Sequence, residues 1–383
     1  MSLFKGREML AVALTVGRGQ LARYGGHSKS ATDAFEREFR QMIGTEHSLA
    51  VNSGTSALMC ALVGAGIGPG DEVLVPAYTW ISSAAAPLAI GAVPVLVDID
   101  DSLTMDPIDI KRKITSRTRA IMPVHMLNLV CDMDSICAIA AEHDLVVIED
   151  ACQAIGARYK GRRVGSIGHA GAFSFNQHKN IKAGEGGMVV TNDQRIITRA
   201  GMFHDVGSYS RPSWVSTEVP LFVGMNLRMP ELISSVLRPQ LARLDKQLAR
   251  RKERRRMMID ALTGHPGLHI SPHHDPEDAI GLTVWFDDPD TAAAFAEPRA
   301  GVNRLIDTGR HVYTSWQSIV SRRTHSDKID PFAWAYGNGW RGDPVTNADC
   351  PRTTEVLART CSVTLDPDLP MPAFRTVVKR IAR

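Results

Sequence analysis

The sequence lacks the features that define several specialised classes of protein. Its six cysteines form neither a CxxC pair nor a regular framework, which argues against a zinc site or a disulfide scaffold and favours buried, reduced thiols. His273 and His274 have no carboxylate at ligand spacing, so we expect no metal site. No apolar run is long enough to span a bilayer, and residues 1–16 lack the apolar core of a signal peptide. These absences predict a cytoplasmic protein without a membrane or metal partner.

A strong excess of either charge is also missing. The net charge of +3 at pH 7 is too small to indicate nucleic-acid binding. The dense basic run at 250–256 lies in a helix-like segment, and we interpret it as a solvent-exposed helix face. The glycine run at 64–70 follows a helix-like segment and precedes a strand-like one. A dinucleotide-binding fingerprint has the reverse order, so this run argues against an NAD-dependent oxidoreductase.

The chain does contain a regular alternation of strand-like and helix-like segments. Such alternation is typical of an α/β fold with a mostly parallel central sheet flanked by helices. The 383 residues suffice for a large domain and a small one, which we place at 1–249 and 250–383, the second as an α+β unit. Strands are expected at 48–51, 72–75, 94–97, 120–124, 145–148, 172–175, 188–190 and 282–286, and helices at 30–43, 57–63, 82–90, 133–142, 291–297 and 231–256, the last kinked at Pro239.

One lysine stands in the turn between two strand-like runs. Lys179 follows the run at 172–175 and precedes the glycines at 184–187, so it is expected at the carboxyl end of a strand, where open α/β sheets bind ligands. A partly desolvated lysine in that position can lose its proton and form a Schiff base. A single loop lysine is more often simply solvated, so the interpretation depends on what else lies nearby.

Three further features are expected at the same edge of the sheet. Asp150 ends an all-apolar strand, and burying its charge is costly unless a cation meets it. Residues 52–56 form a turn of small residues before a helix start, which is a way of holding a phosphate. Trp80, if it does not simply fill the core, offers a flat face to a planar heterocycle. Together with Lys179, these features describe a pocket for pyridoxal phosphate.

Five motifs, in this order and spacing, resemble the DegT/StrS family of sugar and cyclitol aminotransferases, which have the fold-type-I architecture. They are NSGTSAL at 52–58, VPAYTW at 75–80, EDACQ at 149–153, FSFNQHK at 173–179 and GEGG at 184–187. The resemblance extends from about residue 24 to residue 245 and continues more weakly to the end. It implies a pyridoxal phosphate enzyme.

The resemblance also implies roles for individual residues. Lys179 should form the Schiff base and Asp150 should pair with the pyridinium nitrogen. Trp80 should stack on the ring and Gln153 should face its phenolic oxygen, while the phosphate contacts are implied for Gly54, Thr55 and Ser174. The segment GMNLRM at 224–229 resembles one whose asparagine, here Asn226, reaches the phosphate of the partner subunit. An obligate homodimer with a shared active site is therefore implied.

The activity implied is transamination in two half-reactions, from L-glutamine or L-glutamate to a keto-cyclitol or keto-sugar, in amino-sugar or aminocyclitol antibiotic biosynthesis. Substrate contacts are expected from His125, Arg228, His311, Tyr313 and the polar loop at 208–211. Two positions depart from the family pattern: Asn176 stands where many members have histidine, and Asn128 where a glycine is usual. Both leave the cofactor chemistry intact and leave the acceptor open.

Alternatives of two kinds remain. A pyridoxamine phosphate-dependent dehydratase of the same family replaces the Schiff-base lysine, so Lys179 counts against it, and a regulator would keep the pocket without turnover. A keto-acid acceptor would need an arginine clamp, for which Arg211, Arg228 and Arg310 are present. The absence of a separate basic, aromatic-lined segment slightly favours a cyclitol or free sugar over a nucleotide sugar.

Overall fold

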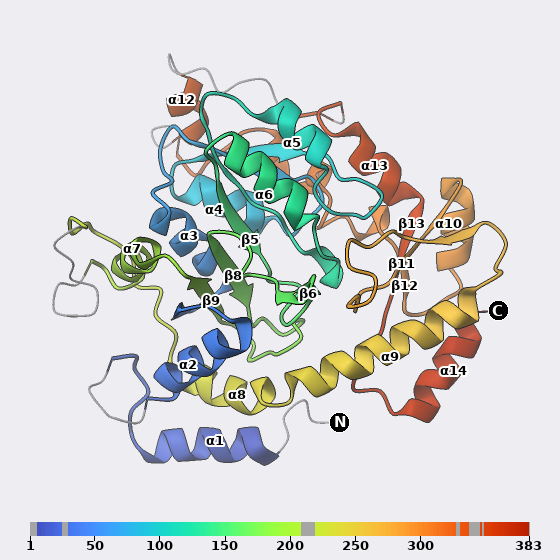
Figure 1. Ribbon diagram of the computed structural model, residues 1–383, viewed down its shortest axis with the longest axis horizontal. Coiled ribbons are helices and arrows are strands. Elements are labelled where there is room, and N and C mark those ends of the chain that lie inside the picture. Colours follow the sequence, from blue (N-terminus) through green and yellow to red (C-terminus); the bar gives the residue numbers. More distant parts are fainter. Residues whose placement is uncertain are drawn as a thin grey trace.

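The computed structural model describes residues 6–24, 30–207, 219–326, 330–336, 345–346 and 348–382 of the chain. A seven-stranded sheet lies at the centre of its larger part (Figure 1). In spatial order the strands are β1 (His47–Val51), β9 (Gly187–Thr191), β8 (Ala170–Ser174), β5 (Val146–Asp150), β4 (Thr118–Ile121), β2 (Glu72–Pro76) and β3 (Val93–Val97). These strands confirm the predicted ones, with ends shifted by about one to three residues.

The neighbouring strands from β8 to β3 all pair in parallel, whereas β9 runs antiparallel to both β8 and β1. The carboxyl ends of the parallel strands therefore meet at one edge of the sheet. In open α/β sheets this edge is where ligands bind.

Successive residues of a strand alternate between two apolar cores, one on each face of the sheet. In β2, for example, Val73 and Val75 belong to one core and Leu74 to the other. The first core is covered by α3 (Gly54–Gly64), α4 (Ser82–Ala89) and α7 (Gln194–His204). The second is covered by α2 (Ala31–Ile43), α5 (Pro107–Lys113), α6 (Met133–Glu142) and α8 (Glu231–Leu241).

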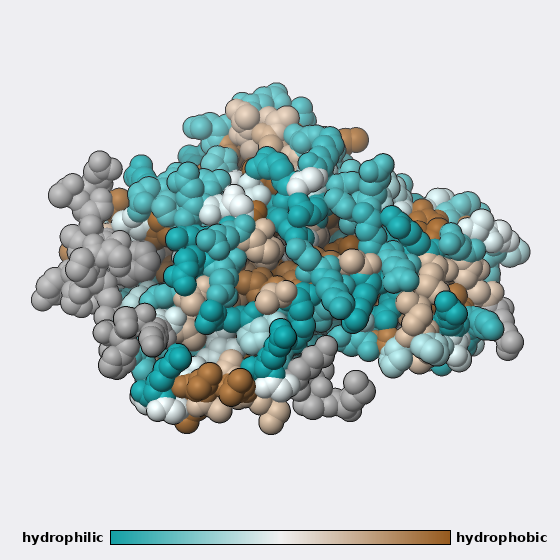
Figure 2. Space-filling model, turned by 60° about the horizontal axis from the view of Figure 1, so that its bottom comes forward, coloured by the Kyte–Doolittle hydropathy of each residue, from teal (hydrophilic) through white to brown (hydrophobic). Residues whose placement is uncertain are grey.

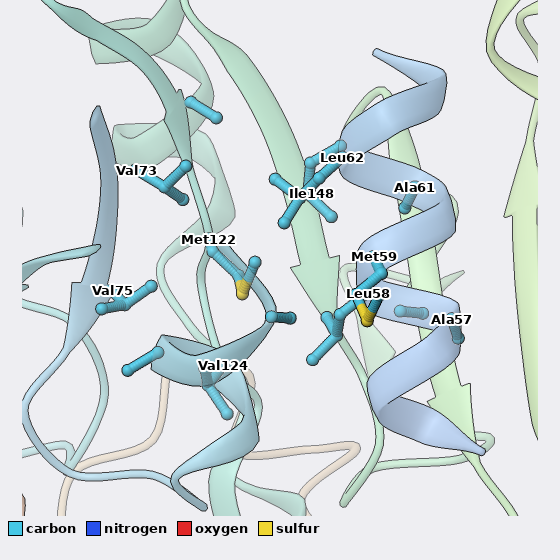
Figure 3. Packing of buried hydrophobic residues seen from close by; sticks show 14 of the residues in the cluster. Ala57, Leu58, Met59, Ala61, Leu62, Val73, Val75, Met122, Val124 and Ile148 are labelled. Atoms are coloured by element: carbon cyan, nitrogen blue, oxygen red, sulfur yellow. The ribbon is translucent and has the colours of Figure 1, made fainter. Parts of the chain in front are cut away.

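The packing of α3 on the sheet fixes the position of its amino end. Figure 3 shows Leu58 and Leu62 of α3 pointing towards Ile148 of β5. Each fully buried leucine contributes about 1.5–3 kcal/mol through removal of apolar surface from water. The start of α3 is thereby held beside the carboxyl ends of β5 and β8.

A smaller antiparallel sheet lies in the second part of the chain. Its order is β10 (Leu268–Ile270), β11 (Thr283–Phe286), β13 (Thr360–Val363) and β12 (Val302–Arg304). A third core joins this sheet to α10 (Pro289–Ala296), α14 (Met371–Ile381) and the second half of α9 (Leu244–Leu262). The remaining elements are β6 (Arg158–Tyr159), β7 (Arg162–Arg163), α11 (Gln317–Val320), α12 (Pro331–Tyr336), α13 (Pro351–Ala358) and the 3₁₀ helices Met126–Asn128, Ile306–Thr308 and Tyr313–Ser315.

Helix α9 runs through the boundary expected at 249/250. Its first half packs in the second core of the large sheet through Leu244 and Leu248, and its second half packs on the small sheet. Side chains from Leu305, Val312 and Leu357 also join the first core of the large sheet. The division into 1–249 and 250–383 stays a prediction, and these contacts tie the two parts together.

The single kinked helix predicted over 231–256 is wrong, because the structure has two helices, α8 and α9, separated by Ala242 and Arg243. Pro239 lies in the last turn of α8, where it cannot donate a hydrogen bond to the carbonyl of Ser235. The basic run at 250–256 is also not uniformly exposed. Arg254 is 3% exposed and donates to the carbonyl oxygens of Asp366 and Leu369.

The cysteines are all free, and five of them are buried, as expected; Cys137 is half-buried. Among the described residues, no helix is both long and apolar enough to cross a membrane. Within the same ranges, no group of three or more His, Cys, Asp or Glu side chains is placed to hold a metal ion.

Helix α1 (Gly6–Gly17) was not anticipated from the sequence. Its buried side chains are polar: Glu8 pairs with Arg243, and the Thr15 hydroxyl lies 2.7 Å from the Ser235 hydroxyl. Its apolar residues point outward instead. A helix with this reversed pattern gives no amphipathic signal for a core-facing helix.

His204, at the end of α7, makes the stability of the fold depend on pH. Its buried ring donates from Nδ1 to the carbonyl of Gly201, and its Nε2 accepts from the Tyr24 hydroxyl at 2.9 Å. Burial lowers the pKa of His204 to about 4. Between pH 6.5 and 4 the unfolded chain therefore binds a proton that the folded chain does not.

We predict that this histidine contributes stability above about pH 6.5 that is lost as the pH falls towards 4, by about 3 kcal/mol in total. Urea unfolding of the wild type and of His204→Gln across this range measures the effect. The variant should lose free energy of unfolding less steeply than the wild type on acidification. If the free energy of unfolding changed with pH equally in both proteins, the pKa of His204 would not differ between the folded and unfolded chain.

Candidate active site

A cavity of about 800 Å³ lies at the carboxyl edge of the large sheet and is also lined by the small sheet. Most of the residues expected at the site line this one cavity. They are Lys179, Asp150, Gly54, Thr55, Trp80, Gln153, Ser174 and His311. They come from the start of α3, from the carboxyl ends of β5 and β8 and from connecting loops, so the fold unites positions that are far apart in the sequence.

Lys179 lies in the turn that leaves the carboxyl end of β8. Backbone hydrogen bonds from Phe175 N to Gly186 O (2.8 Å) and from Lys179 N to Asn176 O (3.0 Å) hold the turn. Gly186 has φ of 134°, which glycine adopts far more readily than other residues. In the part of the chain that the structure describes, Lys179 Nζ has no hydrogen bond or ion pair, and it lines the cavity half-buried. Its amine is therefore available to a ligand.

Asp150 is the last residue of β5, the strand that pairs directly with β8, and it lines the same cavity. Its side chain is 4% exposed; Oδ2 accepts from the Ser83 hydroxyl at 2.7 Å and Oδ1 from the backbone of Cys152 at 3.1 Å. Ser83 is in turn 2.8 Å from the Thr79 hydroxyl. No cationic side chain pairs with Asp150 among the described residues. A buried carboxylate without a cation is costly, so Asp150 fits a ligand that brings its own positive charge.

The start of α3 supplies the third part of the site. Ser53 caps the helix by accepting from Ser56 N at 3.1 Å, and the first N–H groups at Gly54 and Thr55 have no acceptor within the helix. The Thr55 hydroxyl donates to Ser82 at 2.9 Å. Free N–H groups and the positive end of the helix dipole favour a phosphate here.

Gly54 is required by the close approach of α3 to β8. A Cβ atom at this position would lie 2.7 Å from Ser174 Cβ and 3.1 Å from Cys152 Sγ. These residues fit pyridoxal phosphate: donors for the phosphate, a carboxylate for the ring nitrogen and an amine for the aldehyde.

We expect Gly54→Ala to weaken binding of pyridoxal phosphate by roughly tenfold or more, because an added methyl in so close a contact displaces its neighbours at a cost of about 1–3 kcal/mol. Fluorescence titration of the cofactor-free protein measures the dissociation constant. Gly68→Ala is the control, since no atom of the described residues lies within 4 Å of its added Cβ. An unchanged affinity of Gly54→Ala for pyridoxal phosphate would show that the start of α3 does not form the phosphate site.

Trp80 and His311 form another wall. Their ring centroids are 5.7 Å apart at 61°, and Trp80 remains 43% exposed, so it is not core filling. Burial lowers the pKa of His311 to about 4, and the charges of Arg310 and Lys179 act in the same direction. His311 is therefore neutral at pH 7 and can both donate and accept hydrogen bonds.

The prediction that His125 contacts substrate is wrong. Its ring is 0% exposed: Nε2 lies 3.1 Å from the Glu149 carboxylate, and the backbone N–H of Cys131 lies 3.2 Å from Nδ1. Glu149 also accepts three backbone N–H groups at 2.6–2.7 Å, from Gly165, Ile167 and Gly168. The pair thus anchors the loop beneath the strand ends rather than facing the cavity.

The prediction that Tyr313 contacts substrate is also wrong. Tyr313 is buried, and its hydroxyl donates to the carbonyls of Thr346 (3.2 Å) and Cys350 (3.4 Å). Arg228 pairs with the buried carboxylate of Asp205 and does not line the cavity of its own chain. It lies in the segment 224–229 that is expected to reach the partner subunit's site, so its substrate contact stays a prediction. The polar loop at 208–211 lies outside the described residues.

Asn226 is exposed and does not line the cavity of its own chain. Its expected contact is with the partner subunit, so that role stays a prediction.

Sequence reasoning missed several cavity residues. Asn128 lies in the cavity wall with φ of 63°, and its Oδ1 accepts from Asn180 at 2.8 Å. Asparagine tolerates this left-handed conformation better than most residues, which explains how it occupies a position where glycine is usual. The cavity also reaches Gln247, Leu248 and Arg251 of α9, for which the sequence offered no signal beyond their spacing of three to four residues.

Comparison with known proteins agrees with this geometry. Residues 6–306 match the model of the DegT/DnrJ/EryC1/StrS aminotransferase family. The chain is 44% identical over 220 residues to GDP-perosamine synthase from Caulobacter vibrioides, covering 57% of this chain but only 58% of that protein. It is 37% identical to L-glutamine:2-deoxy-scyllo-inosose aminotransferase from Streptoalloteichus tenebrarius, covering 79% of this chain and 77% of that protein.

Solved structures extend the similarity over the whole chain. The crystal structure of 3-amino-5-hydroxybenzoic acid synthase has a TM-score of 0.78 and 31% identity, covering 99% of this chain and 96% of that one. The chain therefore belongs to the DegT/DnrJ/EryC1/StrS aminotransferase family.

Proposed function

We propose that the chain is a pyridoxal phosphate-dependent aminotransferase that moves an amino group from L-glutamine or L-glutamate to a keto-cyclitol or keto-sugar. The observation that carries the proposal is the presence in one cavity of a lysine, Lys179, and a buried carboxylate, Asp150, neither of which has an ionic partner among the residues that the structure describes. This pair is what a pyridoxal phosphate site needs. The start of α3 supports the same proposal.

The residues act on the donor in a defined order. When bound, pyridoxal phosphate supplies an electron sink for the carbanion formed at Cα of the amino donor. Asp150 keeps the ring nitrogen protonated, and Ser83 holds the carboxylate in place through its 2.7 Å hydrogen bond. With the donor bound to the cofactor, Lys179 would take the proton from Cα as a general base and, as a general acid, deliver it to C4′ of the cofactor. Trp80, which lines the cavity, would offer a flat face for the cofactor ring to stack on.

Family relatives support the choice of substrates. One relative is named for transfer from L-glutamine to 2-deoxy-scyllo-inosose, and another is a GDP-perosamine synthase. We propose an acceptor of this polyol type, in amino-sugar or aminocyclitol antibiotic biosynthesis, and a cytoplasmic location. Lys179 argues against the dehydratase alternative, because that branch replaces the lysine.

Labelled nitrogen tests the proposal. The protein is incubated with L-glutamine or L-glutamate carrying ¹⁵N on the α-amino group, together with 2-deoxy-scyllo-inosose, a nucleotide-linked 4-keto-hexose and pyruvate in parallel. Mass spectrometry should find the label in an aminated polyol. Label recovered only in alanine would overturn the polyol acceptor, and label recovered nowhere would overturn the aminotransferase.

We also propose a homodimer with a shared active site. The outward face of α1 carries Met9, Leu10, Leu14 and Val16, all more than 50% exposed, and Figure 2 shows the resulting apolar surface along the lower edge of the molecule. Near Asn226, Val223 is 87% exposed. Apolar surface of this extent on a folded protein is normally covered by a partner. A second copy of the chain would also bring Asn226 to the phosphate site of its partner.

Mixing two inactive variants tests the shared site. We predict that Lys179→Ala and Asn226→Ala, each of low activity alone, regain activity when unfolded and refolded together, because a mixed dimer contains one intact site. Up to a quarter of wild-type activity is expected from random pairing of equal amounts. No gain, in a mixture that light scattering shows to be dimeric, would place Asn226 outside the partner's site.

A further inference from the structure

The cavity extends beyond the cofactor contacts to a second wall, here called the distal wall. It consists of Gln247, Leu248 and Arg251 on α9, together with residues 280–282 and 362–368. The residues that line this cavity and are assigned to the cofactor lie instead on α3, at the carboxyl ends of β5 and β8 and on the loops after β2, β5 and β8. The distal wall is therefore available to the part of a substrate that extends away from the reacting atoms.

Two polar side chains on this wall have unsatisfied groups. Gln247 and Arg251 are one helical turn apart and share a face of α9. Gln247 Oε1 is buried and has no hydrogen-bond partner among the described residues. The guanidinium of Arg251, half-buried, forms no hydrogen bond or ion pair with any residue that the structure describes.

Burial lowers the pKa of Arg251, which indicates that its charge is poorly solvated. Buried donors and acceptors are normally paired. A ligand group that both accepts from Arg251 and donates to Gln247 would satisfy the two side chains, and a hydroxyl group does both.

The rest of the distal wall adds hydrogen-bond acceptors, the carboxylates of Asp366 and Asp368. Asp366 and Asp368 stand on a loop that Arg254 holds against α9 through the carbonyls of Asp366 and Leu369. Among the lining residues that the structure describes, the distal wall has one guanidinium, two carboxylates and no aromatic ring. A nucleotide diphosphate calls for an excess of cations and a surface for its base. Polyol hydroxyls instead need donors and acceptors together.

Resting on the proposed function, we propose that the distal wall binds the hydroxyl groups of a free polyol acceptor, a keto-cyclitol or keto-sugar without a nucleotide, and that Arg251 is a specificity-determining residue. Arg251 and Gln247 hydrogen-bond the ring on the side remote from the ketone. Asp366 accepts from further hydroxyls at the edge of the cavity. A site built in this way rejects acceptors that lack the hydroxyls, because its own polar groups would stay unpaired.

Steady-state kinetics of Arg251→Ala with glutamine and 2-deoxy-scyllo-inosose test the proposal. We expect the KM for the acceptor to rise by about tenfold or more, while exchange of the glutamine α-hydrogen, which reports the donor half-reaction alone, stays unchanged. Arg250→Ala is the matched control, because Arg250 is exposed on the same helix and does not line the cavity. Gln247→Ala should raise the same KM, and thermal melting verifies that each variant folds.

The outcomes separate this proposal from the proposed function. An unchanged acceptor KM in Arg251→Ala and Gln247→Ala, or an equal loss in the donor half-reaction, would overturn the distal wall as an acceptor site. A wild type that aminates only the nucleotide-linked hexose would overturn the free polyol and leave the aminotransferase intact. A wild type that exchanges no α-hydrogen would overturn the proposed function itself.

Discussion

Replacing Lys179 by alanine is expected to abolish the covalent attachment of pyridoxal phosphate and to lower transamination by roughly 10³-fold or more, because one amine serves as both nucleophile and proton carrier. The expectation rests on its place in the cavity and on the absence of any described partner for Nζ. Borohydride treatment followed by peptide mass mapping detects the attachment. In the wild type the reduced adduct should lie on the peptide containing Lys179.

Lys182→Ala provides the control. Lys182 lines the same cavity three residues later, and its backbone N–H donates to Gln240 at 3.0 Å. This variant should keep the adduct on Lys179. An adduct that survives in Lys179→Ala and maps to Lys182 would contradict the assignment.

Asp150→Asn is expected to retain the cofactor and lose turnover by about 10²–10⁴-fold. The amide has nearly the same shape, so the hydrogen bonds from Ser83 and Cys152 leave the site folded. It carries no charge, however, and cannot keep the ring nitrogen protonated. Parallel measurement of cofactor content and kcat separates the two effects.

Ser83→Ala is a milder change at the same site. It removes the 2.7 Å hydrogen bond to Asp150 Oδ2 and leaves the carboxylate, so we expect a loss of about tenfold or less. Activity of Asp150→Asn within a few-fold of the wild type would contradict the role of the carboxylate.

The cofactor part of the site is predictable from the sequence because backbone topology alone brings it together. Lys179 and Asp150 follow adjacent parallel strands, and Gly54 begins the helix that packs on the same sheet. Apolar strand runs identify those positions without knowledge of any side-chain direction. The same logic located Trp80 after β2.

The substrate part is not predictable in this way, because it depends on where side chains point. His125 lies just beyond β4, and Asp150 ends the neighbouring β5, yet the ring of His125 turns inward to Glu149. Tyr313 is buried in the core, where its ring is removed from water and its hydroxyl has two carbonyl acceptors. Arg251 reaches the cavity from α9 only through tertiary packing. The basic composition of residues 250–256 gave no sign of which face would be covered.

Exchange of the α-hydrogen of L-glutamine in deuterated water tests the central claim most directly, since it requires only the cofactor, Lys179 and a donor. Proton NMR follows the loss of the α-proton signal with time. The wild-type protein loaded with pyridoxal phosphate should exchange this hydrogen and Lys179→Ala should not. A wild type that binds the cofactor but exchanges the α-hydrogen of neither glutamine nor glutamate, or a Lys179→Ala variant that exchanges it as fast as the wild type, would contradict a lysine-based aminotransferase.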